Sequence, residues 1–189
     1  MDRRNFLQMS ALAATALPIQ GAFAMQTASQ QTRGAATIIS PKGAQAYSMM
    51  GGGEARLLVT GEKTKGAWWM GRFREDPGFT TQLHYHPKAD EQFYVLEGVL
   101  SVYVVDAWHE LGPGTLGLLP HGTPHAQANH SDKPVHFLGS GAPAGFEKFF
   151  PAVDGLMKRR LKPGTPEFAA EIRKIAAGCD MVPLGPPPK

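Results

Sequence analysis

Short apolar runs alternate with polar positions between residues 36 and 141, and turn-forming residues separate one run from the next. Runs that recur about every 8–12 residues are typical of an antiparallel sandwich or barrel and not of βαβ units. The predicted strands are Thr37–Ser40, Ala55–Thr60, Ala67–Arg74, Phe79–His86, Gln92–Leu96, Leu100–Val105, Thr115–Leu119, His125–Asn129 and Val135–Gly139. This pattern predicts a single all-β domain over residues 36–141.

The strand pattern stops after Gly141, and helical patterns follow it. Residues 144–153 favour a short helix that Pro151 breaks. A longer helix is predicted from an N-cap, a proline at the first helical position, an apolar face and a terminal glycine, which are Thr165, Pro166, Phe168, Ile172, Ile175 and Gly178. We expect this helix to pack its apolar face on the outside of the β domain. Residues 142–189 are therefore predicted to be a C-terminal helical extension and tail.

Residues 1–24 have the organisation of a signal peptide. The charged pair Arg3-Arg4 precedes a mildly apolar stretch from Met9 to Ile19, and Ala22-Phe23-Ala24 offers small residues at a cleavage site. The apolar stretch is interrupted and is shorter than the ~20 residues that cross a bilayer, so we expect no stable membrane anchor. Residues 25–35 are rich in polar residues and are predicted to be a flexible lead-in.

The paired arginines resemble a twin-arginine export signal, because Phe6-Leu7 follows them closely. Asp2 and Gln8 depart from the usual residues of that signal, and an ordinary secretory signal is the alternative. We predict a periplasmic protein that is exported by the twin-arginine route.

Composition and charge exclude several classes of protein. The 22 glycines and 16 prolines among 189 residues exclude a coiled coil or a helical bundle. The net charge is +3, but the basic residues are scattered and their longest run is Lys158-Arg159-Arg160, so nucleic-acid binding has no electrostatic footprint. The single cysteine, Cys179, excludes an intrachain disulfide.

Candidate chemistry is concentrated between residues 78 and 129, which hold five of the seven histidines. His84 and His86 are two residues apart in a predicted strand, so both side chains point to one face. Taken alone, such a pair is more often a surface or core coincidence than a metal site. Glu91 follows after a short turn and His125 comes from a third strand, and three imidazoles with one carboxylate suit a divalent transition metal.

Two stretches match every fixed position of the two cupin motifs, and on that resemblance the chain is identified as a member of the cupin superfamily. The first motif, G-x5-H-x-H-x4-E-x6-G, falls on Gly78, His84, His86, Glu91 and Gly98. The second, G-x5-P-x-G-x2-H-x3-N, falls on Gly114, Pro120, Gly122, His125 and Asn129. The resemblance implies one jelly-roll β-barrel over residues 36–141, with the metal ligands His84, His86, Glu91 and His125.

A narrower resemblance covers nearly all of the chain after residue 24. It rests on Asp90-Glu91 with Phe93–Gly98, on Gly145–Phe150 and on the ending Gly185–Pro188, which look like single-domain bacterial cupins related to quercetin 2,3-dioxygenase. Enzymes of that kind insert both atoms of molecular oxygen into a flavonol and release carbon monoxide. The resemblance implies that Glu91 both ligates the metal and takes the proton of the substrate's enol hydroxyl.

Other functions remain open at this point. A non-catalytic small-molecule-binding cupin and a cupin decarboxylase or isomerase fit the same motifs, and no residue pattern separates an oxygenase from a decarboxylase. Aromatic residues of strands are more often core than pocket, but Phe93 shares a face with Glu91, and it is taken with Phe137 as the candidate lining of a substrate pocket. The expected partners are a small-molecule substrate and molecular oxygen, and a homodimer is left open.

The expected cofactor is one divalent transition metal ion. Three imidazoles and a carboxylate bind copper or zinc more tightly than manganese or iron. By resemblance to its pathway, twin-arginine export carries proteins that have already folded, so the ion would be taken up in the cytoplasm. We therefore predict manganese or iron, with nickel, cobalt, copper and zinc as alternatives.

Overall fold

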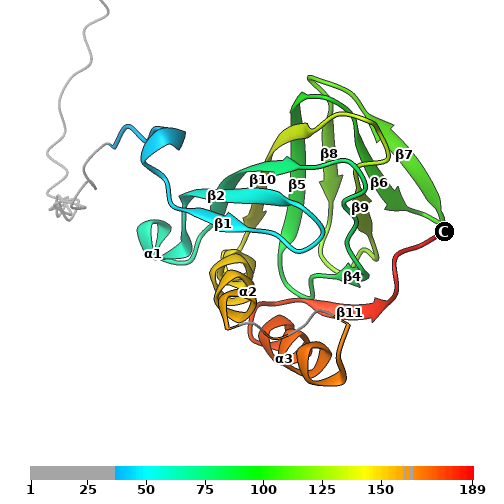
Figure 1. Cartoon of the computed structure of the whole chain (residues 1–189). Helices are drawn as coiled ribbons and strands as arrows, with labels where there is room; N and C mark the ends of the chain where they lie inside the picture. Colours follow the sequence, from blue (N-terminus) through cyan, green and yellow to red (C-terminus); the bar gives the residue numbers. More distant parts are fainter. Residues whose placement is uncertain (1–36, 160, 162–163) are drawn as a thin grey trace, which may run out of the picture. The chain divides into compact units, whose positions relative to one another are not determined.

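Two facing groups of antiparallel strands carry the fold, and two helices lie beside one end of them (Figure 1). The computed structural model describes residues 37–159, 161 and 164–189. The predicted signal peptide over residues 1–24 and the predicted lead-in over residues 25–35 lie outside the described residues.

The larger sheet has six antiparallel strands in an order that differs from their order along the chain. Its strands are, from one edge to the other, β1 (Ala46–Ser48), β2 (Gly53–Val59), β3 (Trp69–Glu75), β10 (Val135–Ala142), β5 (Asp90–Glu97) and β8 (Leu116–Leu119). Strand β10 pairs with β3 on one side and with β5 on the other, although β3 ends at Glu75 and β10 begins only at Val135. This long-range pairing is typical of a jelly roll.

The facing layer consists of a three-stranded and a two-stranded sheet. The first contains β7 (Ala107–Leu111), β6 (Leu100–Val104) and β9 (Ala126–Ala128), and the second contains β11 (Val182–Gly185) and β4 (Leu83–Tyr85). Two isolated bridges, Thr80 with Ala128 and His84 with His125, join the segments around β4 and β9. Strand β4 is thereby held between β11 and the chain that leads into β9.

The hydrophobic core lies between the two layers because alternate residues of each strand point inward. Along β5 the buried residues are Glu91, Phe93 and Val95, and the residues between them are exposed. Along β3 the inward face carries Trp69, Phe73 and Glu75. The prediction that Phe93 and Val95 share a face with Glu91 is confirmed.

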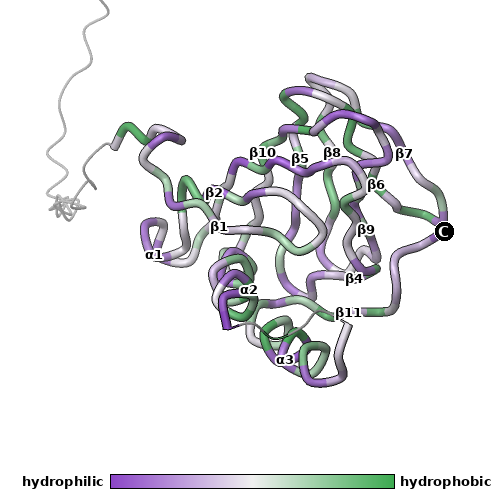
Figure 2. The backbone as a smooth tube through the Cα atoms, in the orientation of Figure 1, coloured by the Kyte–Doolittle hydropathy of each residue, from purple (hydrophilic) through white to green (hydrophobic). Residues whose placement is uncertain are grey.

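The C-terminal extension contains η2 (Phe146–Lys148), α2 (Phe149–Lys158) and α3 (Pro166–Ala177). Helix α3 begins after Thr165, whose hydroxyl accepts from the Phe168 amide, and it ends before Gly178, as predicted. Phe168 and Ile172 pack with Val153 and Leu156 of α2 in a second apolar cluster. Figure 2 shows hydrophobic and hydrophilic residues alternating along both helices, as expected for helices with one buried face.

Pro151 does not break the helix that was predicted over residues 144–153. It lies in the first turn of α2, where the backbone amides have no partner within the helix. A proline therefore costs little at that position, and the helix continues to Lys158.

The strand prediction was wrong at one place and incomplete at others. Thr37–Ser40 is not a strand; Ile38 is exposed, and Ser40 caps the short helix η1 (Pro41–Gly43). The prediction did not contain β1, β7, β11 or the short helix α1 (Gly61–Thr64). Strand β7 escaped notice because its hairpin turn with β6 uses Val105 and Asp106, both with positive φ, where glycine or asparagine is the usual signal.

The described residues thus form an all-β jelly-roll domain with a short C-terminal helical extension. No helix among the described residues is long and apolar enough to cross a membrane.

Gly98→Ala should destabilise the protein much more than Gly78→Ala. Both glycines have a φ near +80°, so each substitution costs about 1–2 kcal/mol of backbone strain. A methyl group at position 98 would also lie 2.8 Å from the Pro134 carbonyl oxygen, whereas nothing lies within 4 Å at position 78. We expect an additional loss of about 1–3 kcal/mol for Gly98→Ala in urea unfolding. Equal losses would contradict this packing argument.

Candidate metal centre

Four buried side chains from three segments meet inside the barrel. His84 belongs to β4, His86 follows it directly, Glu91 is the second residue of β5, and His125 precedes β9. They are the four residues predicted as ligands, and their candidate ligand atoms all lie within 4.8 Å of one another. Each of the four residues is less than 5% exposed.

Backbone pairing brings two of these histidines together. His84 and His125 form an antiparallel bridge in which each amide donates to the other's carbonyl, at 2.9 and 2.8 Å. His86 lies on the same face as His84 because the two are separated by one residue of extended chain. Glu91 faces them from β5, which is paired on both sides, with β8 at Leu119 and with β10 at Gly141.

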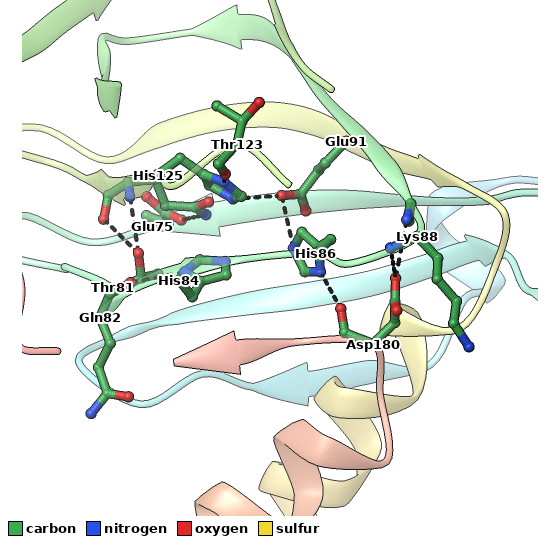
Figure 3. Close-up of polar contacts among 12 residues, drawn as sticks. Glu75, Thr81, Gln82, His84, His86, Lys88, Glu91, Thr123, His125 and Asp180 are labelled. Atoms are coloured by element: carbon green, nitrogen blue, oxygen red, sulfur yellow. Dashed lines mark hydrogen bonds and ion pairs between the residues drawn. The ribbon is translucent and has the colours of Figure 1, made fainter. Parts of the chain in front are cut away.

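Each imidazole is oriented by a hydrogen bond from its Nδ1 to a backbone carbonyl. The acceptors are Gln82 for His84 at 2.8 Å, Asp180 for His86 at 2.8 Å and Thr123 for His125 at 2.9 Å (Figure 3). A carbonyl accepts only from a protonated nitrogen, so Nδ1 carries the hydrogen in all three rings. In the neutral rings this leaves the Nε2 lone pair free to bind a metal.

The Nε2 atoms and the carboxylate face one another in a way that suits a cation. Glu91 Oε2 lies 3.0 Å from His125 Nε2 and 3.3 Å from His86 Nε2. An ionised carboxylate only accepts hydrogen bonds, and a neutral Nε2 does the same. A proton on an imidazole or a metal ion must therefore lie between them. The donor set fits a divalent transition metal, which these four side chains would hold.

Burial and neighbouring charges shift the pKa values of His84, His86 and Glu91. Burial, together with His125, lowers the pKa of His84 to about 4, so this ring is neutral near pH 7. Burial alone would raise the pKa of Glu91, but its contacts with His125 and His86 hold that pKa well below its usual range. Burial lowers the pKa of His86, yet the nearby Glu91 outweighs it and the net shift is upward. A metal that binds here displaces this proton from His86.

The site opens on an apolar cavity of about 630 Å³, which His84 and Glu91 help to line. Phe93 and Phe137, predicted as pocket residues, are both 2% exposed or less and both line this cavity. Trp69 and Phe79 line it as well, whereas Trp68 is not among its lining residues. A cavity of this size with an apolar lining and a few polar groups is typical of small-molecule sites.

The C-terminal extension supplies a second wall of the same cavity, which the sequence did not indicate. Its lining residues there are Phe146, Phe149, Phe150, Val153, Phe168, Ile172 and Arg173. The periodicity of α3 predicted a buried face, but nothing local indicates that this face borders a cavity rather than solid core.

Gln127 is a polar lining residue that the sequence analysis missed. It lies two residues after His125, and its Nε2 donates to Glu75 Oε1 at 2.7 Å. Glu75 is fully buried, and burial raises its pKa to about 8, against the smaller opposing effect of the Gln127 bond. The inward alternation of Trp69, Phe73 and Glu75 could have indicated a buried acid. Because this pKa lies above 7, the neutral form of Glu75 predominates at pH 7. Glu75 Oε1 holds the Gln127 side chain through its amide nitrogen.

The remaining histidines and Asn129 lie outside the cluster. His121 is exposed and pairs with Asp90 at 2.8 Å, while His109 and His130 are exposed. Asn129 holds its strand end, because its amide donates to the carbonyls of Glu75 and Lys133.

Comparisons with known proteins agree with this arrangement. The family model described as "Cupin domain" matches residues 71–140. Protein SchB of Streptomyces halstedii is 36% identical over 97 residues, which cover 49% of this chain and 70% of that protein. The chain belongs to the cupin family.

Solved cupins of low sequence identity share the fold. The polyketide cyclase RemF from Streptomyces resistomycificus is 21% identical, with a TM-score of 0.51 over 57% of this chain and 80% of that one. KdgF from a Halomonas species is 16% identical, with a TM-score of 0.52 over 58% and 94% of the two chains. A predicted oxalate decarboxylase from Thermotoga maritima is 21% identical, with a TM-score of 0.51 over 57% and 99%. At this level of identity the matches support the cupin fold alone.

His86→Ala should give a folded barrel that has lost most of its metal, because ligand loss acts on the site more than on the core. Metal content would be measured by elemental analysis and folding by circular dichroism. His121→Ala is the matched control, since His121 is exposed and lies outside the cluster. A His86→Ala protein with the metal content of the control would refute the assignment.

Glu75→Gln should remove a pH dependence from the stability of the protein. The pKa of Glu75 is raised from 4.5 to about 8 in the folded state, so its stabilising effect is complete below about pH 4.5 and is lost as the pH rises through about 8. A difference of one in pKa corresponds to about 1.4 kcal/mol, so the free energy of unfolding should change by several kcal/mol over this pH range. In urea unfolding between pH 5 and 9, the stability of the variant relative to the wild type should increase as the pH rises. A constant difference would show that Glu75 does not titrate in this way.

Proposed function

We propose that this protein is a mononuclear metal-dependent oxygenase of the quercetin 2,3-dioxygenase type, acting on a small phenolic or enolisable substrate. The observation that carries the proposal is a buried cluster of three histidines and one glutamate at the wall of an aromatic cavity. A structural metal site has no need of such a cavity, whereas a catalytic one needs access for a substrate. We propose manganese or iron as the ion.

The protein residues have separate roles in this proposal. His84, His86 and His125 would hold the ion, which supplies Lewis-acid and redox chemistry when bound. The Glu91 carboxylate is ionised and borders the cavity, so it can accept the proton of an acidic substrate hydroxyl. Burial favours the neutral form of this carboxyl and the histidine contacts favour the ionised form, and this balance sets its strength as a base.

The cavity walls would orient the substrate and exclude water. Phe93 and Phe137 lie with their ring centroids 5.6 Å apart in an edge-to-face arrangement, which gives a rigid apolar wall. The aromatic residues of η2 and α2 line the same cavity. One amide hydrogen of Gln127 is donated to Glu75. The other amide hydrogen and the amide oxygen of Gln127 could bind a hydroxyl or carbonyl of the substrate.

Two further proposals concern the setting of the protein. Periplasmic location by twin-arginine export rests on Arg3-Arg4 and the apolar stretch that follows them, which lie outside the described residues. A homodimer is supported by large apolar side chains that are exposed on the neighbouring strands β5 and β8, namely Tyr94, Leu96, Leu116 and Leu118.

The test is oxygen uptake and carbon monoxide release by protein loaded with manganese or iron, with flavonols, enediols and oxalate offered in parallel. Glu91→Gln should lower turnover at least about 100-fold, because the amide removes the base. Its metal content should fall much less, because the amide keeps one ligating oxygen.

Glu97→Gln is the control, since Glu97 lies on the same strand and is exposed. A Glu91→Gln protein with wild-type turnover would show that Glu91 is not the proton acceptor. Carbon dioxide from oxalate without net oxygen uptake would indicate a decarboxylase. Metal-loaded protein that turns over none of these substrates would favour a binding module.

A further inference from the structure

The segment that follows α3 is joined to the metal cluster, although it lies outside the cupin match over residues 71–140. Asp180 Oδ2 accepts hydrogen bonds from the amides of Lys88 and Ala89, at 3.2 and 3.1 Å. The carbonyl of the same Asp180 accepts the His86 Nδ1 hydrogen at 2.8 Å. One residue thus contacts both the imidazole of a candidate ligand and the loop behind it (Figure 3).

The loop that Asp180 holds connects two of the four candidate ligands. Residues 87–90 run from His86 to Glu91, and the amides of Lys88 and Ala89 converge on one carboxylate oxygen. A hydrogen bond to a charged acceptor is stronger than one between neutral groups. The position of this loop sets the separation of the His86 and Glu91 side chains, whose facing atoms lie 3.3 Å apart.

Asp180 is itself anchored on both sides. Cys179 and Met181 are buried in the main core, and their amides both donate to the Ala176 carbonyl at the end of α3. Directly afterwards β11 pairs with β4, with Val182 opposite Tyr85 and Pro183 opposite His84. Asp180 has a left-handed backbone conformation, with a φ of 54°, and this turn directs the chain from the helix to the strand.

We infer that Asp180 is a positioning residue for the metal centre, and that the α3–β11 segment is a required part of the site. This inference rests on the metal-dependent function proposed above and extends it to residues outside the cupin domain. The Asp180 carbonyl fixes the tautomer and the ring orientation of His86, and the Asp180 carboxylate fixes the loop that joins His86 to Glu91. Removal of such outer partners typically lowers metal affinity about 10–100-fold.

The decisive variant is Asp180→Gly, measured as the dissociation constant for Co²⁺ in competition with a chelator. Glycine accepts the left-handed conformation, so this change removes the carboxylate without backbone strain. We expect Co²⁺ affinity to fall about 10–100-fold and the visible spectrum of the Co²⁺ protein to change. Asp180→Asn should restore both, because asparagine keeps one acceptor oxygen and tolerates this conformation.

Asp154→Ala is the matched control. Asp154 of α2 also fastens the extension to the barrel, since its carboxylate accepts the Ser48 amide at 3.2 Å, but it does not contact the ligand loop. Its removal should leave Co²⁺ affinity and the spectrum unchanged. If Asp180→Gly does not fold, Asp180→Ser provides the second variant and should weaken Co²⁺ binding in the same direction.

Two results would overturn the inference. One is an Asp180 variant with wild-type affinity and spectrum, and the other is a wild-type protein that binds no stoichiometric Co²⁺. Turnover is not part of this measurement, so the two proposals fail separately. Wild-type protein whose Co²⁺ affinity depends on Asp180 but which consumes no oxygen would refute the oxygenase alone.

Discussion

The hydrogen bonds from three imidazole Nδ1 atoms to backbone carbonyls are the constraint on which the site depends. Each fixes a ring that would otherwise rotate, and each leaves Nε2 as the atom that faces Glu91. Two of the acceptors, Gln82 and Thr123, lie two residues before their own histidines and come with the local chain. The third, Asp180, is 94 residues away and depends on the packing of the C-terminal extension. The orientation of the His86 ring therefore depends on how firmly the C-terminal extension holds Asp180.

The same extension also supplies a large part of the apolar lining of the cavity. The inner faces of β3, β5 and β10 supply Trp69, Phe73, Phe93 and Phe137 to its lining. The aromatic residues of η2 and α2 and the buried face of α3 supply the other part of the apolar lining. Apolar surroundings strengthen the electrostatic interactions of the cluster beside them. The orientation of His86 and the apolar lining of the cavity thus both depend on the C-terminal extension.

Local sequence rules predicted the structure correctly where residues close together in the chain determine it. The face shared by His84 and His86 follows from extended geometry, and the limits of α3 follow from Thr165, Pro166 and Gly178. The rules failed where pairing with a distant segment determines whether a strand forms. Strand β11 contains Pro183 and has four residues, and it is a strand because β4 offers a free edge. Strand β7 follows a turn with Val105 in a left-handed conformation, which the pairing with β6 stabilises and no local preference would indicate.

The sequence by itself determined the fold class and the identity of the clustered residues. The motif spacings assign three histidines and a glutamate to the segments around β4, β5 and β9, and Gly78 and Gly98 supply turns with positive φ before β4 and after β5. Only the tertiary structure decided which atoms of those residues face one another, that Gln127 lines the cavity while its amide is held by the buried Glu75, and that Asp180 supports His86. The physical reason is that ring orientation, burial and ionisation depend on contacts between residues far apart in the chain, and spacing along the chain carries no information about them.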